Sequence, residues 1–198
     1  MSGKNLTQVI RESLENQGEE TALSITREIF SWFLIIAGAI GVALLLNRFI
    51  IVNAQVTSSS MSNTIQTWDR VLGLRVDYWF KSPQRGDVIF FLNPDDESVI
   101  YVKRVIGTPG DTVEIRGGTT YINGEALDEP YLAEPAADLD FGPYNVPEGY
   151  YFFLGDNRNN SRDSRYLQHT YVSEDKILGK AYWVYYPRLQ SITHSNEK

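Results

Sequence analysis

The chain has 198 residues, of which 42% are hydrophobic, with no cysteine and a formal net charge of −7. The lack of cysteine excludes a disulfide framework and thiolate metal sites, and two histidines are too few for a zinc site of the usual kind. The acidic balance argues against nucleic acid as a partner, because phosphate binding needs clustered Lys and Arg.

Residues 1–28 are polar and rich in Glu, and they predict a short amphipathic helix or a loose tail. An uncharged run from Ile29 to Leu46 follows, and the apolar character resumes after Arg48 and continues to Val52. At about 1.5 Å per residue, a helix over residues 29–52 is long enough for a hydrocarbon core of about 30 Å. We therefore predict a transmembrane helix at 29–52.

Two alternatives to a membrane anchor remain at this point. One is a buried core helix, and the other is a cleaved signal peptide, although the polar lead differs from a short basic n-region. Three cations, Lys4, Arg11 and Arg27, precede the span, whereas Arg48 alone follows it before Arg70. This count favours a cytoplasmic N-terminus and an extracytoplasmic C-terminal body.

Residues 53–187 predict a mainly β domain built of antiparallel sheet, because short β-like runs alternate there with turn dipeptides such as Gly117-Gly118 and Asn123-Gly124. Residues 107–149, rich in Gly, Pro, Asp and Glu, predict an insertion into this domain, and residues 188–198 a C-terminal tail. The predicted strands cover residues 71–76, 87–92, 99–106, 112–115, 119–122, 150–154 and 180–186.

Lys103 is the first candidate for chemistry, since a chain without cysteine supplies serine and lysine most readily as nucleophile and base. In a strand through Val99–Ile106 it shares one face with apolar side chains, while Arg104 lies on the other face. Burial would lower the lysine pKa and supply a neutral amine. An edge strand whose lysine points to water explains the same pattern without function.

Two serines could act with this lysine. Ser60 lies in a Ser/Thr cluster after the span, a composition that is also ordinary for a linker. Ser161 lies in a polar loop that follows an aromatic strand, where its hydroxyl could orient an amine. A solvated turn explains that loop equally well.

Four sequence blocks in register resemble those of type I bacterial signal peptidases, a family that uses a Ser-Lys dyad. The resemblance runs from the hydrophobic span to about Pro187. The blocks are 58–65 (SSSMSNTI), 69–72 with 85–90 (DRVL, RGDVIF), 101–111 (YVKRVIGTPGD) and 155–165 (GDNRNNSRDSR).

The resemblance implies a role for each matching residue. Ser60 would be the nucleophile that forms the acyl-enzyme, and Lys103 its general base, which later activates the deacylating water. Ser161 would hydrogen-bond to the lysine amine and orient it. The Ser60 backbone N–H and the Ser58 hydroxyl would form the oxyanion hole. No metal or cofactor is implied.

Asp163 and Arg165 would form an ion pair that supports the loop of the last block. Substrates would be preproteins with signal peptides that carry small residues at P1 and P3, close to membrane lipid and the secretion translocon. The resemblance points to the cell membrane of a bacterium of Gram-positive type. The chain departs from the family pattern at Ser59 and Trp68, where Gly is usual, and at Asn63, where Pro is usual.

Three other functions remain open. A self-cleaving repressor uses the same Ser-Lys logic, but it carries a DNA-binding domain where this chain has a hydrophobic span. A catalytically silent, membrane-anchored binding module is the alternative of another class. A Ser-His-Asp hydrolase would use His169 or His194, neither of which lies in a motif that would position it.

Overall fold

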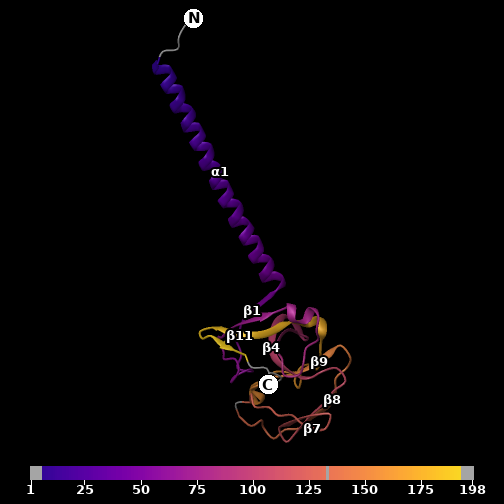
Figure 1. Cartoon of the computed structure of the whole chain (residues 1–198). Helices are drawn as coiled ribbons and strands as arrows, with labels where there is room; N and C mark the ends of the chain where they lie inside the picture. Colours follow the sequence, from indigo (N-terminus) through magenta and orange to yellow (C-terminus); the bar gives the residue numbers. More distant parts are fainter. Residues whose placement is uncertain (1–5, 133, 193–198) are drawn as a thin grey trace. The chain divides into compact units, whose positions relative to one another are not determined.

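The computed structural model describes residues 6–132 and 134–192, which divide into two compact units between Arg48 and Phe49 (Figure 1). In the described chain one long apolar helix precedes an antiparallel, mainly β domain. This arrangement confirms the predicted fold class. The predicted domain boundaries as such stay a prediction.

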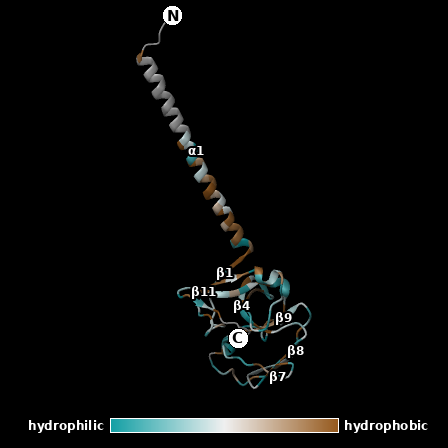
Figure 2. Cartoon of the chain, in the orientation of Figure 1, coloured by the Kyte–Doolittle hydropathy of each residue, from teal (hydrophilic) through white to brown (hydrophobic). Residues whose placement is uncertain are grey.

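Helix α1 spans Leu6–Phe49. The described part of the polar leader and the apolar run therefore form one continuous helix, whereas a separate short helix or a loose tail was predicted for the leader. Its part from Ser24 to Phe49 is long and apolar enough to cross a membrane, and Figure 2 shows hydrophobic residues along it. The helix ends three residues before the predicted end of the span. Ile51 and Val52 instead begin a strand, which suits their β-branched side chains.

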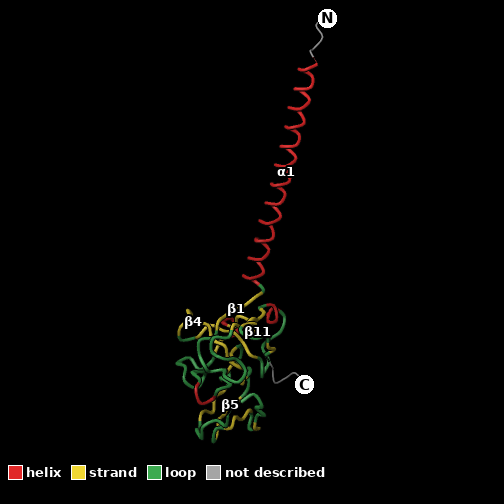
Figure 3. Tube along the Cα trace, turned by 90° about the vertical axis from the view of Figure 1, so that its left-hand side faces the viewer, coloured by secondary structure: helices red, strands yellow, loops and turns green. Residues whose placement is uncertain are grey.

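The larger sheet has eight strands, and every pair in it is antiparallel. Its order is β1-β2-β11-β3-β4-β9-β10, with β12 paired to β11, and Figure 3 shows its strands in yellow. The strands are β1 (Ile51–Gln55), β2 (Arg70–Leu74), β3 (Val88–Asn93), β4 (Asp96–Gly107), β9 (Tyr150–Leu154), β10 (Val172–Ser173), β11 (Ile177–Tyr186) and β12 (Gln190–Ser191).

The smaller sheet has the order β7-β6-β5-β8 and lies within the predicted insertion. Its strands are β5 (Thr112–Arg116), β6 (Thr119–Ile122), β7 (Glu125–Ala126) and β8 (Phe141–Asn145). The two predicted turns, Gly117-Gly118 and Asn123-Gly124, connect β5 to β6 and β6 to β7, with positive φ at all four residues. Short 3₁₀ helices are η1 (Val76–Trp79), η2 (Arg158–Asn160) and η3 (Glu174–Lys176).

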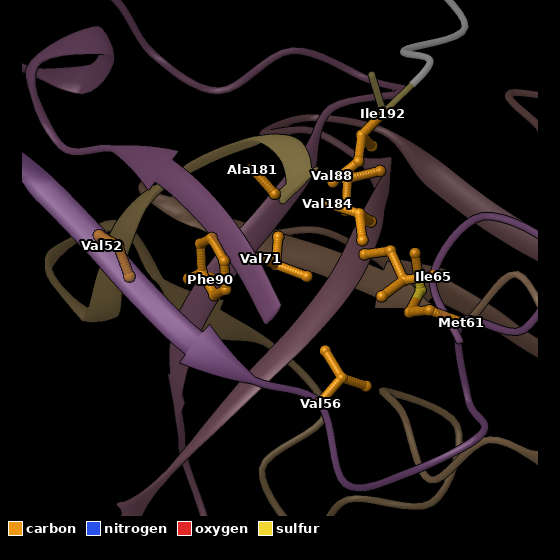
Figure 4. Packing of buried hydrophobic residues seen from close by; sticks show 10 residues of the cluster. All are labelled: Val52, Val56, Met61, Ile65, Val71, Val88, Phe90, Ala181, Val184 and Ile192. Carbon is orange, nitrogen blue, oxygen red and sulfur yellow. The ribbon is translucent and has the colours of Figure 1, made fainter. Parts of the chain in front are cut away.

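The segment after β1 is fixed to the β domain by its apolar side chains. Met61 and Ile65, four residues apart in a turn, are fully buried in the core cluster drawn in Figure 4. Phe90 of β3 and Val184 of β11 belong to the same cluster. Burying these side chains removes them from water, and this holds Ser60, the residue before Met61, in place.

The described part of the predicted C-terminal tail, residues 188–192, packs against the β domain. Arg188 donates to both carboxylate oxygens of buried Asp69 at 2.8 Å. Strand β12 pairs with β11, and Ile192 is 1% exposed in the core. The sequence missed this because one isolated Ile and one Arg carry no strand pattern.

Candidate active site

Ser60 lies in the turn that follows β1, directly before the buried Met61. Consecutive turn hydrogen bonds shape this segment, from Ser62 N to Ser59 O and from Ile65 N to Met61 O. The Ser60 residue is 6% exposed, so its hydroxyl is largely withdrawn from solvent.

Lys103 comes from the middle of β4, where its residue is only 3% exposed. Its Nζ lies 2.5 Å from the Ser60 Oγ and 3.2 Å from the Val102 carbonyl oxygen. The fold therefore brings together two residues that lie 43 positions apart in the sequence. The alternative of an edge-strand lysine that points to water is contradicted.

Burial lowers the pKa of the Lys103 amine from 10.5 to about 8, because the charged form loses its hydration. The carboxylates of Asp163 and Asp156 oppose this change, since negative charge nearby favours the ammonium form. Desolvation is the larger effect. A substantial fraction of the amine is thus neutral near pH 8, the form that can accept a proton from a serine.

The two groups predicted to bind an oxyanion, the Ser58 hydroxyl and the Ser60 N–H, lie beside the Ser60 Oγ. The Ser58 Oγ is 3.2 Å from the Ser60 Oγ, and Ser58 itself is exposed. Within the described chain the Ser60 N–H has no hydrogen-bond partner, whereas the Ser60 carbonyl accepts from the Asn157 N–H at 3.0 Å. An N–H without a partner beside a nucleophile is available to stabilise negative charge.

Ser161 lies close to the dyad but makes no hydrogen bond to Lys103. Its Oγ is buried and has no partner in the described part of the chain. A Cβ added to Gly155 would come within 2.3 Å of this Oγ and 2.4 Å of the Ser60 carbonyl oxygen. The hydroxyl and the nucleophile's backbone are therefore close to each other, on one side of Gly155. The role of Ser161 as the residue that orients the lysine stays a prediction.

Asp163 and Arg165 lie together in the loop that contains Ser161. Arg165 Nε and Nη2 donate to the two Asp163 oxygens at 2.8 and 2.9 Å, and both side chains are almost fully buried. Asp163 also accepts from the Gly155 N–H at 3.1 Å, and Arg165 donates to the Arg158 carbonyl at 2.8 Å. The pair thus connects both ends of the loop, although its functional role stays a prediction.

Arg104 and Asp156 form a second buried ion pair, which the sequence alone did not predict. Arg104 Nε and Nη2 donate to the two Asp156 oxygens at 2.8 and 2.7 Å, and both side chains are 1% exposed. The same carboxylate accepts from the Thr64 hydroxyl. Arg104 in an apolar strand was the available signal, because a fully buried arginine needs a partner.

A pocket of about 110 Å³ opens beside the dyad. Its walls are the end of β1 with the segment that follows, and the outer part of β4. Lining residues include Ser58, Ser60 and Lys103, together with the apolar Val56 and Val102. The site therefore combines a nucleophile, a base and a small, partly apolar cleft.

Three departures from the family pattern, Ser59, Asn63 and Trp68, lie in the segment between β1 and β2 that contains Ser60. Asn63 and Trp68 adopt positive φ, of 93° and 74°, which explains why glycine suits the second of these positions. Ser59 is fixed from outside, because its Oγ accepts from Asn160 Nδ2 at 2.9 Å and its carbonyl accepts from Asn157 Nδ2 at 3.1 Å. Polar contacts with Asn157 and Asn160 thus hold the segment at Ser59.

The histidines give no support to a Ser-His-Asp site. The ring of His169 is exposed and hydrogen-bonds to Asp95 at 3.0 Å, at the turn between β3 and β4. His194 lies outside the described residues. In the described chain no group of His, Asp and Glu residues is arranged to hold a metal ion.

Comparisons with known proteins identify the family of the chain. The family described as "Signal peptidase, peptidase S26" matches residues 29–186. Signal peptidase I T of Bacillus subtilis is 35% identical over 185 residues, which cover 89% of this chain and 95% of that protein. Probable signal peptidase I-2 of Synechocystis sp. is 34% identical over 190 residues, 93% of this chain and 82% of that protein.

Among solved structures, a signal peptidase I from Enterococcus faecalis V583 is 41% identical, with a TM-score of 0.45, and the match covers 50% of this chain and 97% of that one. The family match and the curated relatives each span most of the chain. The chain therefore belongs to the signal peptidase family, peptidase S26, and is a serine peptidase.

Proposed function

We propose that the chain removes signal peptides from secreted preproteins by an acyl-enzyme mechanism, with Ser60 as nucleophile and Lys103 as general base. The observation that carries this proposal is the 2.5 Å distance between the Ser60 Oγ and the Lys103 Nζ, both in buried residues. A neutral amine at this distance accepts the hydroxyl proton as the oxygen attacks.

In the first step the Ser60 Oγ forms a bond to the scissile carbonyl carbon, and its proton passes to the Lys103 Nζ. The Ser60 N–H and the Ser58 hydroxyl donate to the resulting oxyanion. The C–N bond then breaks, and the lysine ammonium gives its proton to the leaving amine. In the second step the neutral amine takes a proton from a water molecule as the water oxygen bonds to the acyl carbon. The bond between that carbon and the Ser60 Oγ then breaks, and the lysine ammonium returns its proton to the Ser60 Oγ. The buried Ser161 hydroxyl orients the amine, and the ion pair of Asp163 and Arg165 holds the loop.

The substrate binds as an extended strand in the pocket beside the dyad. Among the described strands, β1 pairs only with β2, so its other edge is free. The part of β4 that ends at Lys103 pairs only with β3, because β9 pairs with β4 from Arg104 onward, and this part also presents a free edge. A peptide added to such an edge places alternate side chains on one face. The pocket of about 110 Å³ favours small residues at P1 and P3.

The apolar part of α1 anchors the enzyme in the cell membrane of a bacterium of Gram-positive type. The positive charges before the span place the N-terminus in the cytoplasm and the β domain outside, where preproteins emerge beside the translocon. Membrane lipid surrounds the span. Protease treatment of intact cells tests this orientation: external cleavage of the N-terminal segment would contradict it.

The decisive experiment uses the full chain in detergent or liposomes with a preprotein that has a small-x-small cleavage site. We expect Ser60→Ala and Lys103→Ala to abolish cleavage and Lys81→Ala, at an exposed lysine, to retain it. Full activity of folded Lys103→Ala would disprove the mechanism. A preprotein with a bulky P1 residue should resist cleavage, and equal cleavage would remove the specificity proposal. A wild-type chain that cleaves nothing would favour the silent binding module.

A further inference from the structure

The segment Glu129-Pro130-Tyr131 lies outside the dyad, and its residues Glu129 and Tyr131 contact both loops that form the active site. This anchor segment follows β7, the last strand before β8 in the smaller sheet. Glu129 has a side chain that is only 7% exposed, and Tyr131 is largely buried. The Tyr131 hydroxyl donates to Glu129 Oε1 at 2.7 Å, so the two side chains are coupled to each other.

Glu129 connects the segment to the loop that contains Gly155. Its carboxylate accepts two hydrogen bonds from Arg158, whose side chain is 2% exposed. The same guanidinium donates from Nε to the Gly155 carbonyl at 3.2 Å and from Nη1 to Thr120 at 2.7 Å. Glu129 thereby neutralises the buried cation that holds the Gly155 peptide group.

Tyr131 connects the segment to the strand of Lys103 and to the turn of Ser60. Its ring covers the Arg104 guanidinium, with 4.0 Å from the guanidinium carbon to the ring centroid. Its carbonyl accepts from the Asn63 Nδ2 at 2.8 Å. Asn63 follows the nucleophile by three residues, and Arg104 is the residue after Lys103.

We infer that Glu129 and Tyr131 are positioning residues, which fix the Ser60 turn and the Gly155 loop relative to Lys103. The inference rests on the proposed Ser-Lys mechanism. Neither side chain reaches the dyad, so their effect passes through Asn63, Arg104 and Arg158. The consequence is a loss of turnover rather than of substrate binding when the segment is disturbed, because the free edges of β1 and β4 are elsewhere.

The first test compares Tyr131→Leu with Tyr121→Leu in the full chain. The Tyr121 ring covers the Arg116 guanidinium in the same way, with 3.9 Å from the guanidinium carbon to the ring centroid. This pair lies in the β5–β6 hairpin, and its arginine is exposed. We expect Tyr131→Leu to lower kcat about 10²-fold with little change in KM, since small displacements of reacting groups cost this much. Tyr121→Leu should leave kcat unchanged. Equal kcat for the two folded variants would overturn the inference.

The second test is Asn63→Gly, which remains decisive if Tyr131→Leu does not fold. Glycine tolerates the φ of 93° at this position, so the substitution removes the hydrogen bond to Tyr131 without backbone strain. We expect kcat to fall about 10-fold with an unchanged melting temperature. An unchanged kcat would refute the inference. Ser60→Ala is assayed in parallel: cleavage by that variant would instead remove the proposed mechanism.

Discussion

Gly155 is the position where the smallest possible change should disturb the dyad most. A Cβ at this residue would lie 2.4 Å from the Ser60 carbonyl oxygen and 2.3 Å from the Ser161 Oγ, whereas real Cβ contacts are not shorter than 3.0 Å. The Ser60 backbone must therefore move by about 0.6 Å or more in Gly155→Ala. The Ser161 side chain must move as well.

A displacement of this size at the nucleophile should lower kcat between about 10-fold and 10²-fold, because catalysis depends on the alignment of the reacting atoms. The measurement is steady-state cleavage of a preprotein by the full chain, with thermal unfolding followed in parallel. Gly73→Ala is the matched control, since its Cβ would also lie 2.4 Å from a backbone oxygen, that of Lys180 in β11. This control should lose stability and keep kcat in the folded fraction. Wild-type kcat for Gly155→Ala would refute the reasoning.

Three further predictions concern charge. Activity should rise with pH through about 8, as Lys103 loses its proton, and a flat profile from about 7 to 9 would contradict a neutral-amine base. Folding lowers this pKa from 10.5 to about 8, so the folded state loses the proton at lower pH than the unfolded state. The free energy of unfolding of the wild type should therefore rise by about 3 kcal/mol relative to that of Lys103→Met between pH of about 8 and 10.5. Denaturant titrations that show no such gain would exclude burial of the Lys103 amine. Arg188→Ala should cost about 1–2 kcal/mol in the same assay, since it leaves buried Asp69 unpaired, and no loss would mean that residues 188–192 do not stabilise the fold.

Local patterns in the sequence were sufficient for most of the fold. The apolar run predicted the helix. Alternation with turn dipeptides predicted β2, β3, β4, β5, β6, β9 and β11, within one or two residues at most ends. Strand β8 was missed because Gly142 and Pro143 interrupt its alternation, which an edge strand tolerates. The predicted span includes the first two residues of β1, because Ile51 and Val52 continue the apolar run.

The sequence by itself determined which residues are candidates for chemistry, because a chain with no cysteine and only two histidines leaves serine and lysine as the available nucleophile and base. The four sequence blocks identify the family. It did not determine that Lys103 is buried. Alternation along one strand shows which side chains share a face, but it does not show which other part of the chain packs against that face. Only the tertiary structure decided this, by placing the Ser60 turn against β4. The same holds for Glu129 and Tyr131: their contacts with Arg158 and Arg104 join segments far apart in the chain, and desolvation and charge act through space rather than along the sequence.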